Sequence, residues 1–181
     1  MQNIHTATGR EIPKINEIYR HFKGHIYSVT AVGVHKETGI PMVIYHSFDN
    51  KFWARPLDMF LSPVDTKKYP AETQKNRMEN VTDLEHIELD VNRAVNCKQT
   101  KIQEIADEMK RPVPQIGEIY ECATGGYAII NAIATSTETD ETLIVFSQNR
   151  ETWIMPFRKF LEPVNKAEYP NTKQEFYFEK R

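Results

Sequence analysis

The sequence predicts a mainly β protein in which two tandem copies of one small domain are joined by a helical segment. Three observations predict it: the chain aligns with itself at an offset of about 100 residues, each aligned half consists of short β-branched and aromatic runs, and the stretch between has helical periodicity. We expect a first repeat over residues 12–70, a linker over 71–112, a second repeat over 113–170 and a C-terminal segment over 171–181.

The internal repeat is the strongest signal in the chain. Residues 13–19 align with residues 114–120 at an offset of 101, which becomes 100 after one residue is dropped near Asp49. The identical pairs follow in order along the chain: Gly24 with Gly125, Trp53 with Trp153, Pro56 with Pro156, Phe60 with Phe160 and Tyr69 with Tyr169. About a third of the aligned positions are identical, against roughly one in sixteen for unrelated chains, which indicates duplication.

Within the first repeat, runs of β-branched and aromatic residues predict four short strands, over residues 26–34, 42–47, 52–55 and 61–64. Residues 36–39 offer turn chemistry, and Pro56 should end the third strand because proline cannot donate to a ladder. One helical turn fits residues 57–60, and the second repeat follows the same plan over residues 127–164. Such closely spaced strands indicate a small closed barrel or a sandwich. A unit of about 55 residues buries only about 60% of its unfolded surface, so we expect packing against neighbouring parts of the chain to stabilise it.

The connecting stretch differs in its periodicity. Leu84, Ile87, Val91 and Val95 lie on one face of a predicted helix, and a second helix fits residues 101–110. The apolar side of this second helix comprises Ile102, Ile105, Ala106 and Met109. These apolar stripes predict packing either on the barrels or on a second copy of the chain, so a homodimer is one possible form of the protein. Residues 176–178 are too apolar for a free tail and should dock, as an added strand or across a subunit boundary.

The first repeat resembles a known family in residues 19–24, Tyr27 and Val29, 35–38, 43–45 and 53–60. The family is catalogued as domain of unknown function 1653 and occurs in bacteria and phages. The resemblance implies an SH3-like small barrel and no established chemistry, so it assigns no catalytic residue. The second repeat is a weaker match. The first departs at Asn16, where the family usually has glycine, and this predicts an altered first turn.

Composition limits the classes of function. A net charge of -2 disfavours nucleic acid as partner, because proteins that grip many phosphates usually carry a basic excess. The chain shows neither a secretory signal nor an apolar run of about 18 residues, so we expect a cytoplasmic protein with no membrane partner. We read Cys97 and Cys122 as reduced thiols rather than as a disulfide or part of a zinc site.

Polar residues present in the first repeat and replaced in the second are the best candidates for function, because the domain evidently folds without them. With two aromatic residues they make the predicted ligand-binding set: Arg20, His21, Lys23, His35, Tyr45, His46, Trp53 and Arg55. If these converge, they form a cationic pocket walled by aromatic rings, suited to a small anionic or nucleotide-like ligand. The alternatives are a scattered solvated surface for the charged residues and a purely core role for Trp53.

Catalytic and metal-binding patterns are not found in the sequence. It has no Gly-x-Ser-x-Gly, no phosphate-binding glycine loop and no paired carboxylate motif, and His21 with His25 would bind metal together only on a helix. We therefore expect a non-enzymatic binding module without cofactor or metal. A protein-interaction adaptor is the alternative function, and a nucleic-acid-binding protein is a third.

Overall fold

Two units make up the chain, and each is a β-sheet with one short helix between its last two strands. The computed structural model describes residues 4–47, 49, 51–83 and 99–181. The first unit takes in Met1–Gly33 and Ile40–Ala94, and the second takes in Val34–Gly39 and Val95–Arg181. The first predicted linker helix and Cys97 lie outside the described residues.

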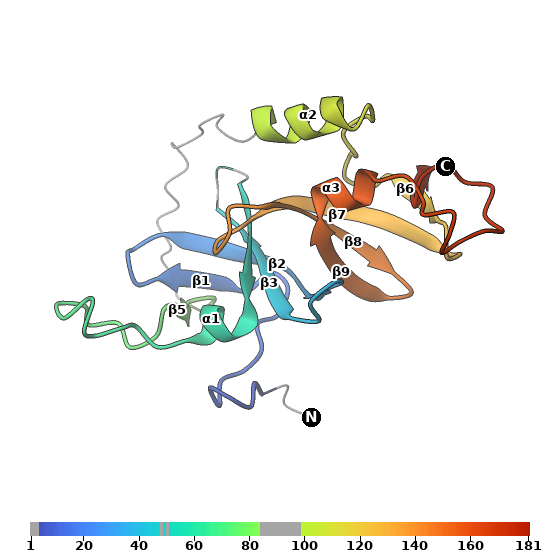
Figure 1. Cartoon of the computed structure of the whole chain (residues 1–181). Helices are drawn as coiled ribbons and strands as arrows, with labels where there is room; N and C mark the ends of the chain where they lie inside the picture. Colours follow the sequence, from blue (N-terminus) through green and yellow to red (C-terminus); the bar gives the residue numbers. More distant parts are fainter. Residues whose placement is uncertain (1–3, 48, 50, 84–98) are drawn as a thin grey trace. The chain divides into compact units, whose positions relative to one another are not determined.

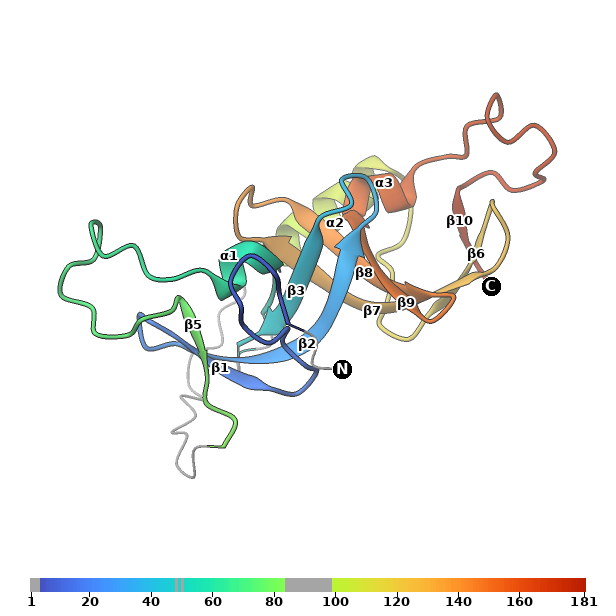
Figure 2. The same ribbon diagram turned by 90° about the horizontal axis from the view of Figure 1, so that it is seen from below.

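The first unit has its strands in the neighbour order β4-β3-β2-β1-β5. Their bounds are β1 Ile18–His21, β2 Ile26–His35, β3 Pro41–His46, β4 Phe52–Pro56 and β5 Met78–Asn80. Helix α1, Leu57–Leu61, follows β4 directly, and Figure 2 shows β1, β2 and β3 side by side. The three strands predicted over 26–34, 42–47 and 52–55, and the helical turn after them, are confirmed.

The second unit has the same order of elements. Its strands are β6 Ile119–Cys122, β7 Tyr127–Ser136, β8 Thr142–Gln148, β9 Glu151–Pro156 and β10 Phe178–Lys180, with α3 Phe157–Leu161 after β9 (Figure 1). Strand β10 pairs antiparallel with β6, and Phe178 is fully buried, so the prediction that residues 176–178 dock as an added strand is confirmed. The predicted helix over residues 101–110 is also confirmed, as α2 Gln99–Glu108.

The strand predicted over residues 61–64 is wrong. Leu61 ends α1, and Pro63 forms only an isolated bridge with Asn76. Pro63 has no N–H for a ladder, so this segment cannot continue the sheet. The closing strand is instead β5, which pairs with β1 and lies within the stretch that we expected to be a helical linker.

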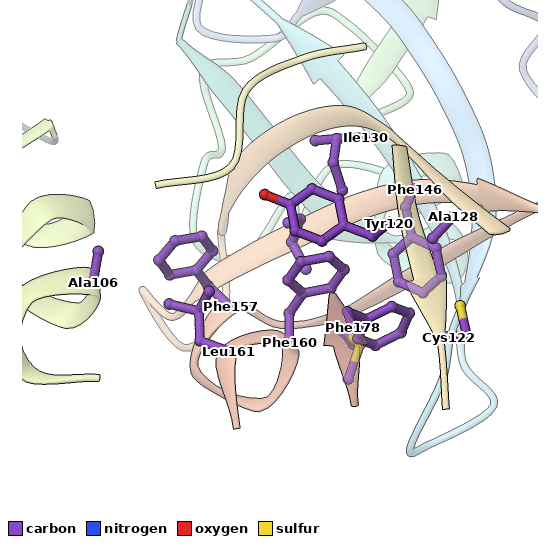
Figure 3. Close-up of a cluster of buried hydrophobic side chains, with 12 residues drawn as sticks. Ala106, Tyr120, Cys122, Ala128, Ile130, Phe146, Phe157, Phe160, Leu161 and Phe178 are labelled. Atoms are coloured by element: carbon purple, nitrogen blue, oxygen red, sulfur yellow. The ribbon is translucent and has the colours of Figure 1, made fainter. Parts of the chain in front are cut away.

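Each unit has an aromatic core beneath its short helix. In the first, Tyr19, Tyr45 and Phe60 are buried, and the ring centroids of Tyr19 and Phe60 are 5.0 Å apart. In the second, the rings of Phe160 and Phe178 stack at 4.3 Å (Figure 3). The side of α2 predicted to be apolar packs on this second core through Ile102, Ile105, Ala106 and Met109, which confirms packing on the sheet as the role of that stripe.

The first turn of both units has the same backbone conformation. Asn16 has φ 70° and Gly117 has φ 85°, and both N–H groups donate at 2.8 Å, to the carbonyls of Val29 and Ile130. Asparagine tolerates this left-handed conformation better than other side chains do. The expectation that Asn16 alters the turn is therefore wrong.

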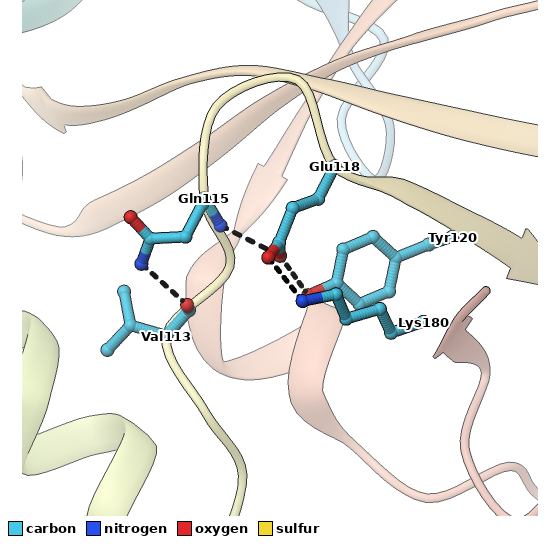
Figure 4. A network of polar contacts seen from close by, with 5 residues as sticks. All are labelled: Val113, Gln115, Glu118, Tyr120 and Lys180. Carbon is cyan, nitrogen blue, oxygen red and sulfur yellow. Dashed lines mark hydrogen bonds and ion pairs between the residues drawn. The ribbon is translucent and has the colours of Figure 1, made fainter.

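A glutamate holds this turn against the tyrosine of the next strand. In the second unit, Glu118 accepts hydrogen bonds from the backbone N–H of Gln115 and the hydroxyl of Tyr120, both at 3.0 Å, and pairs with Lys180 (Figure 4). In the first unit, Glu17 accepts in the same way from the N–H of Lys14 at 2.9 Å and the hydroxyl of Tyr19 at 3.0 Å.

An arginine joins the end of the helix to the last strand in each unit, and we call this contact the arginine clip. Arg10 donates to the carbonyls of Leu61 at 2.9 Å and Met78 at 2.6 Å. Arg111 donates to the carbonyls of Leu161 at 3.4 Å and Phe178 at 2.8 Å. Burial lowers the pKa of both guanidinium groups, which stay charged because the ordinary arginine pKa is so high.

Within the described part of the chain, no helix has the length and apolar character needed to cross a membrane.

Replacing Arg10 by alanine should lower the free energy of unfolding by about 2 kcal/mol, because two buried carbonyls lose a charged donor. Arg10→Lys should recover only part of the loss, since an ammonium cannot reproduce the two-pronged geometry of guanidinium. Urea unfolding followed by circular dichroism measures the change.

The control is Lys14→Ala, because Lys14 forms an exposed pair with Glu11 at 3.8 Å and such pairs contribute little. Equal effects of the two alanine variants would contradict the role of the clip.

Candidate functional site

The candidate site lies on the inward face of the first unit. In the register of β3 with β4, Tyr45 is opposite Trp53 and Val43 is opposite Arg55, so all four side chains share one face. Val43 and Tyr45 are buried there, and Trp53 packs against the same core while half-buried. The structure therefore brings three predicted residues, Tyr45, Trp53 and Arg55, to one surface.

The guanidinium of Arg55 contacts one tyrosine and acts electrostatically on a second. Its Nε donates to the hydroxyl of Tyr45 at 3.2 Å, and the ring of Tyr45 meets the ring of Tyr27 edge-on with centroids 5.1 Å apart. Burial, with a further contribution from Tyr45, raises the pKa of Tyr27 to about 12. The Tyr27 hydroxyl consequently stays protonated at neutral pH.

The pKa of His21 depends on burial and on the positive charges around the ring. Burial, followed by the positive charges of Arg55, Arg77 and Lys23 in that order, lowers the pKa of His21 to about 4. Its Nδ1 accepts the backbone N–H of Lys23 at 3.2 Å, as only a neutral ring can. We call Arg55, Arg77 and Lys23, gathered around neutral His21, the cationic cluster.

Two further rings lie beside the cationic cluster. Phe22 and Tyr69 have centroids 4.8 Å apart, and the ammonium of Lys23 lies 5.8 Å from the first centroid and 5.4 Å from the second. The guanidinium carbon of Arg77 lies 5.8 Å from the Phe22 ring. Cations and aromatic faces thus alternate, as in sites that hold a flat anionic molecule.

Sequence reasoning missed Tyr27, Phe22, Tyr69 and Arg77. Arg77 could have been found by the criterion that selected the others, because the offset of 100 aligns it with Tyr177 and the arginine is again confined to the first half. The expected repeat ends at residue 70, before the closing strand, so Arg77 and Tyr177 lie outside it. Tyr27 aligns with Ala128 at the offset of 101 and follows the same rule.

Three predicted residues lie elsewhere. Arg20 is exposed and adjoins the buried Tyr19 on β1, so it points to the opposite face. His46 follows Tyr45 on β3 and likewise faces away, with Nδ1 3.0 Å from the Thr30 hydroxyl and its ring 5.3 Å from that of Phe52. His35 is buried in the second unit, where its Nδ1 has no hydrogen-bond partner among the described residues. Arg20 and His46 lie away from the candidate site because neighbouring residues on a strand face opposite sides of the sheet. His35 lies away from it because this residue belongs to the second unit.

The second unit has no positively charged side chain at the positions aligned with Arg55 and Arg77. Cys122, Phe146, Met155 and Tyr177 align with His21, Tyr45, Arg55 and Arg77. Burial raises the pKa of the Cys122 thiol to about 11, so it is protonated at neutral pH. The two units therefore present different chemistry at the same place in the fold.

Metal ligands and acidic groups are sparse in the site. The described part of the chain contains no group of three or more His, Cys, Asp or Glu side chains arranged to hold a metal. Asp49, which acts electrostatically on Tyr27, is paired with Lys51 at 2.9 Å. The described residues instead place arginine and lysine beside aromatic rings.

These features define a mainly β protein whose first unit brings cations and aromatic rings together. Residues 17–79 match the family model described as "Protein of unknown function (DUF1653)". The match reaches the closing strand β5 and contains every member of the cationic cluster. No curated protein and no solved structure matches the chain.

Lowering the pH should destabilise the protein through His21. The ordinary pKa is 6.5 and the folded value about 4, so between these values the unfolded chain binds more protons and stability falls as the pH falls. His21→Asn, whose amide can still accept the Lys23 N–H, should flatten the dependence. Urea unfolding at pH 7 and at pH 4.5 measures it.

His25→Asn is the matched control, because His25 is exposed in the same turn and its charge is the smallest of the contributions to the His21 pKa, so its loss should leave a slope close to that of wild type. An unchanged slope in His21→Asn would show that another group carries the pH dependence.

Proposed function

We propose that the protein is a non-enzymatic binding module whose first unit takes a small anionic or nucleotide-like molecule. The observation that carries the proposal is the cationic cluster, in which Arg55, Arg77 and Lys23 add to the effect of burial in keeping His21 neutral. Like charges brought together around a half-buried histidine are costly unless something offsets them, and a bound anion does so.

Each group has a role in binding such a ligand. Arginine presents paired N–H donors in a plane, which suits phosphate and carboxylate oxygens, and Lys23 adds a point charge. The Nδ1 of His21 accepts a hydrogen bond, so Nε2 carries the ring proton and is a neutral donor. Phe22, Tyr27 and Tyr69 offer faces and edges against which a planar group can pack.

The architecture proposed with this function is a pair of tandem SH3-like small barrels. The identical order of five strands and one helical turn in both units supports it, as do the two arginine clips and the two glutamate contacts. In this proposal the second barrel has kept the fold and lost the cationic cluster. Its residues aligned with His21, Arg55 and Arg77 are Cys122, Met155 and Tyr177.

Calorimetry against a panel of nucleoside mono-, di- and triphosphates should show one ligand bound with micromolar or tighter affinity per chain. Arg55→Ala should weaken that binding about tenfold or more, because a charged hydrogen bond to an anion contributes about 1.5–3 kcal/mol. Arg55→Lys should give an intermediate value.

Arg20→Ala is the matched control, since it removes an arginine of the same unit that faces away from the cationic cluster. Equal weakening by the two alanine variants would assign the affinity to general surface charge. Binding to no member of the panel would contradict the proposal.

An apolar patch on the second unit favours a protein-interaction adaptor as the second candidate. Ile119 and Ile129 are opposite one another on β6 and β7, and they are 44% and 45% exposed. Tyr127 on the same unit is 45% exposed. Exposed apolar side chains that adjoin one another commonly mark contact surfaces.

An adaptor function predicts that one stoichiometric partner is recovered with the wild-type chain and lost with Ile129→Lys, while Glu151→Lys, an exposed change in the same unit, keeps it. Affinity purification with quantitation of the bound protein tests this. Recovery of the same partner by Ile129→Lys would show that the apolar patch is not the surface that binds it.

A further inference from the structure

One lysine of the second unit lies among three aromatic rings. The ammonium of Lys36 is 5.6 Å from the ring centroid of Phe146, 5.5 Å from that of Tyr177 and 5.5 Å from that of Phe178. Each distance is within the range in which the negative face of a ring attracts a cation. We call Phe146, Tyr177 and Phe178 the aromatic cage.

The rings of the cage are steeply inclined to one another. Phe146 and Phe178 meet at 65° with centroids 5.4 Å apart, and Tyr177 and Phe178 meet at 61° with centroids 4.9 Å apart. Figure 3 shows Phe146 and Phe178 close together in the core of this unit. Both are fully buried, so their positions are fixed by packing and do not depend on the cation. A cation among three inclined rings is attracted from several sides at once.

Backbone pairing presents Lys36 to the cage. Val34 and His35 pair in parallel with Trp153 and Ile154 on β9, and the N–H of Lys36 donates to the carbonyl of Ile154 at 2.7 Å. A short extended segment added to a strand, with one side chain held separately, is a common mode of peptide recognition. Lys36 forms no ion pair within the described part of the chain, and besides the three rings its charge acts on the buried thiol of Cys122.

The first unit cannot hold a cation in this way. The residues aligned with Phe146, Tyr177 and Phe178 are Tyr45, Arg77 and Met78, so one ring remains and a guanidinium replaces another. Arg77 would repel an ammonium where Tyr177 attracts one. The aromatic cage is therefore a property of the second unit and is independent of the function proposed for the first.

We propose that the aromatic cage is a binding site for alkylammonium cations, such as lysine or methylated lysine side chains, and that Lys36 of the same chain fills it. With Lys36 removed, the three rings keep their places in the core and the cage accepts an ammonium from solution. The segment Val34–Gly39 thus acts as a built-in ligand of the second unit.

The test uses the full chain with Lys36→Ala, labelled for NMR of its aromatic rings, and two probes of equal shape. Choline carries a quaternary ammonium, and 3,3-dimethyl-1-butanol is its neutral counterpart. Choline should shift the resonances of Tyr177 and Phe178 in Lys36→Ala and bind about tenfold more tightly than the alcohol. Wild type should respond to neither probe, and Lys173→Ala, which removes an exposed lysine of the same unit, should behave as wild type.

Equal binding of choline and the alcohol would overturn the proposal, because the space would then be merely apolar. An equal choline response in wild type would show that Lys36 does not fill the cage. Should Lys36→Ala fail to fold, Lys36→Gln replaces it. In either case the ε-methylene protons of Lys36 in wild type should resonate well upfield of those of Lys173, through the ring currents. Coincidence of the two resonances would also overturn the proposal.

Discussion

The arginine clip is the contact on which the rest of each unit depends. The closing strands β5 and β10 have three residues each and pair with a single neighbour, so ladder hydrogen bonds alone hold them weakly. The guanidinium adds two donors and ties the carbonyl end of the short helix to the closing strand. In the first unit this places Arg77, the residue before Met78, beside β1 and His21, so the clip also positions the site.

The same order of strands carries different charges in the two units. Where the first has Arg55 and Arg77, the second has Met155 and Tyr177, so two positively charged side chains are exchanged for uncharged ones. The strands, the short helix and the clip do not change with this exchange. The side chains at the ends of a few strands decide what each unit can bind.

The sequence predicted the elements that follow strong periodic patterns. Strands β2, β3 and β4, helix α1 and the docking of Phe178 could be derived because their apolar residues are numerous. Strand β1 and the closing strand β5 escaped prediction because β1 includes Arg20 and His21, and β5 includes Glu79 and Asn80. A strand that short is defined by its partner, which a single sequence does not reveal.

The candidate site was predictable in part, for a geometric reason. Selecting the polar residues that are replaced in the second half identified His21, Lys23 and Arg55, and the same criterion applies to Arg77. It could not separate Tyr45 from His46, although neighbours on a strand face opposite ways. The same criterion also grouped His35 with the others. Val34–Gly39 belongs to the second unit in the structure, and the residue types of this segment do not indicate that assignment.

The stacked pair Phe160 and Phe178 has a consequence for synthesis on the ribosome. The core of the second unit lacks one of its main rings until residue 178 has emerged, whereas the first unit has all its strands once residue 80 is out. During translation the first unit can close while the second still exposes Phe146 and Phe160. The growing chain is therefore most open to aggregation or chaperone capture in the interval before residue 178 has emerged, and through its second unit.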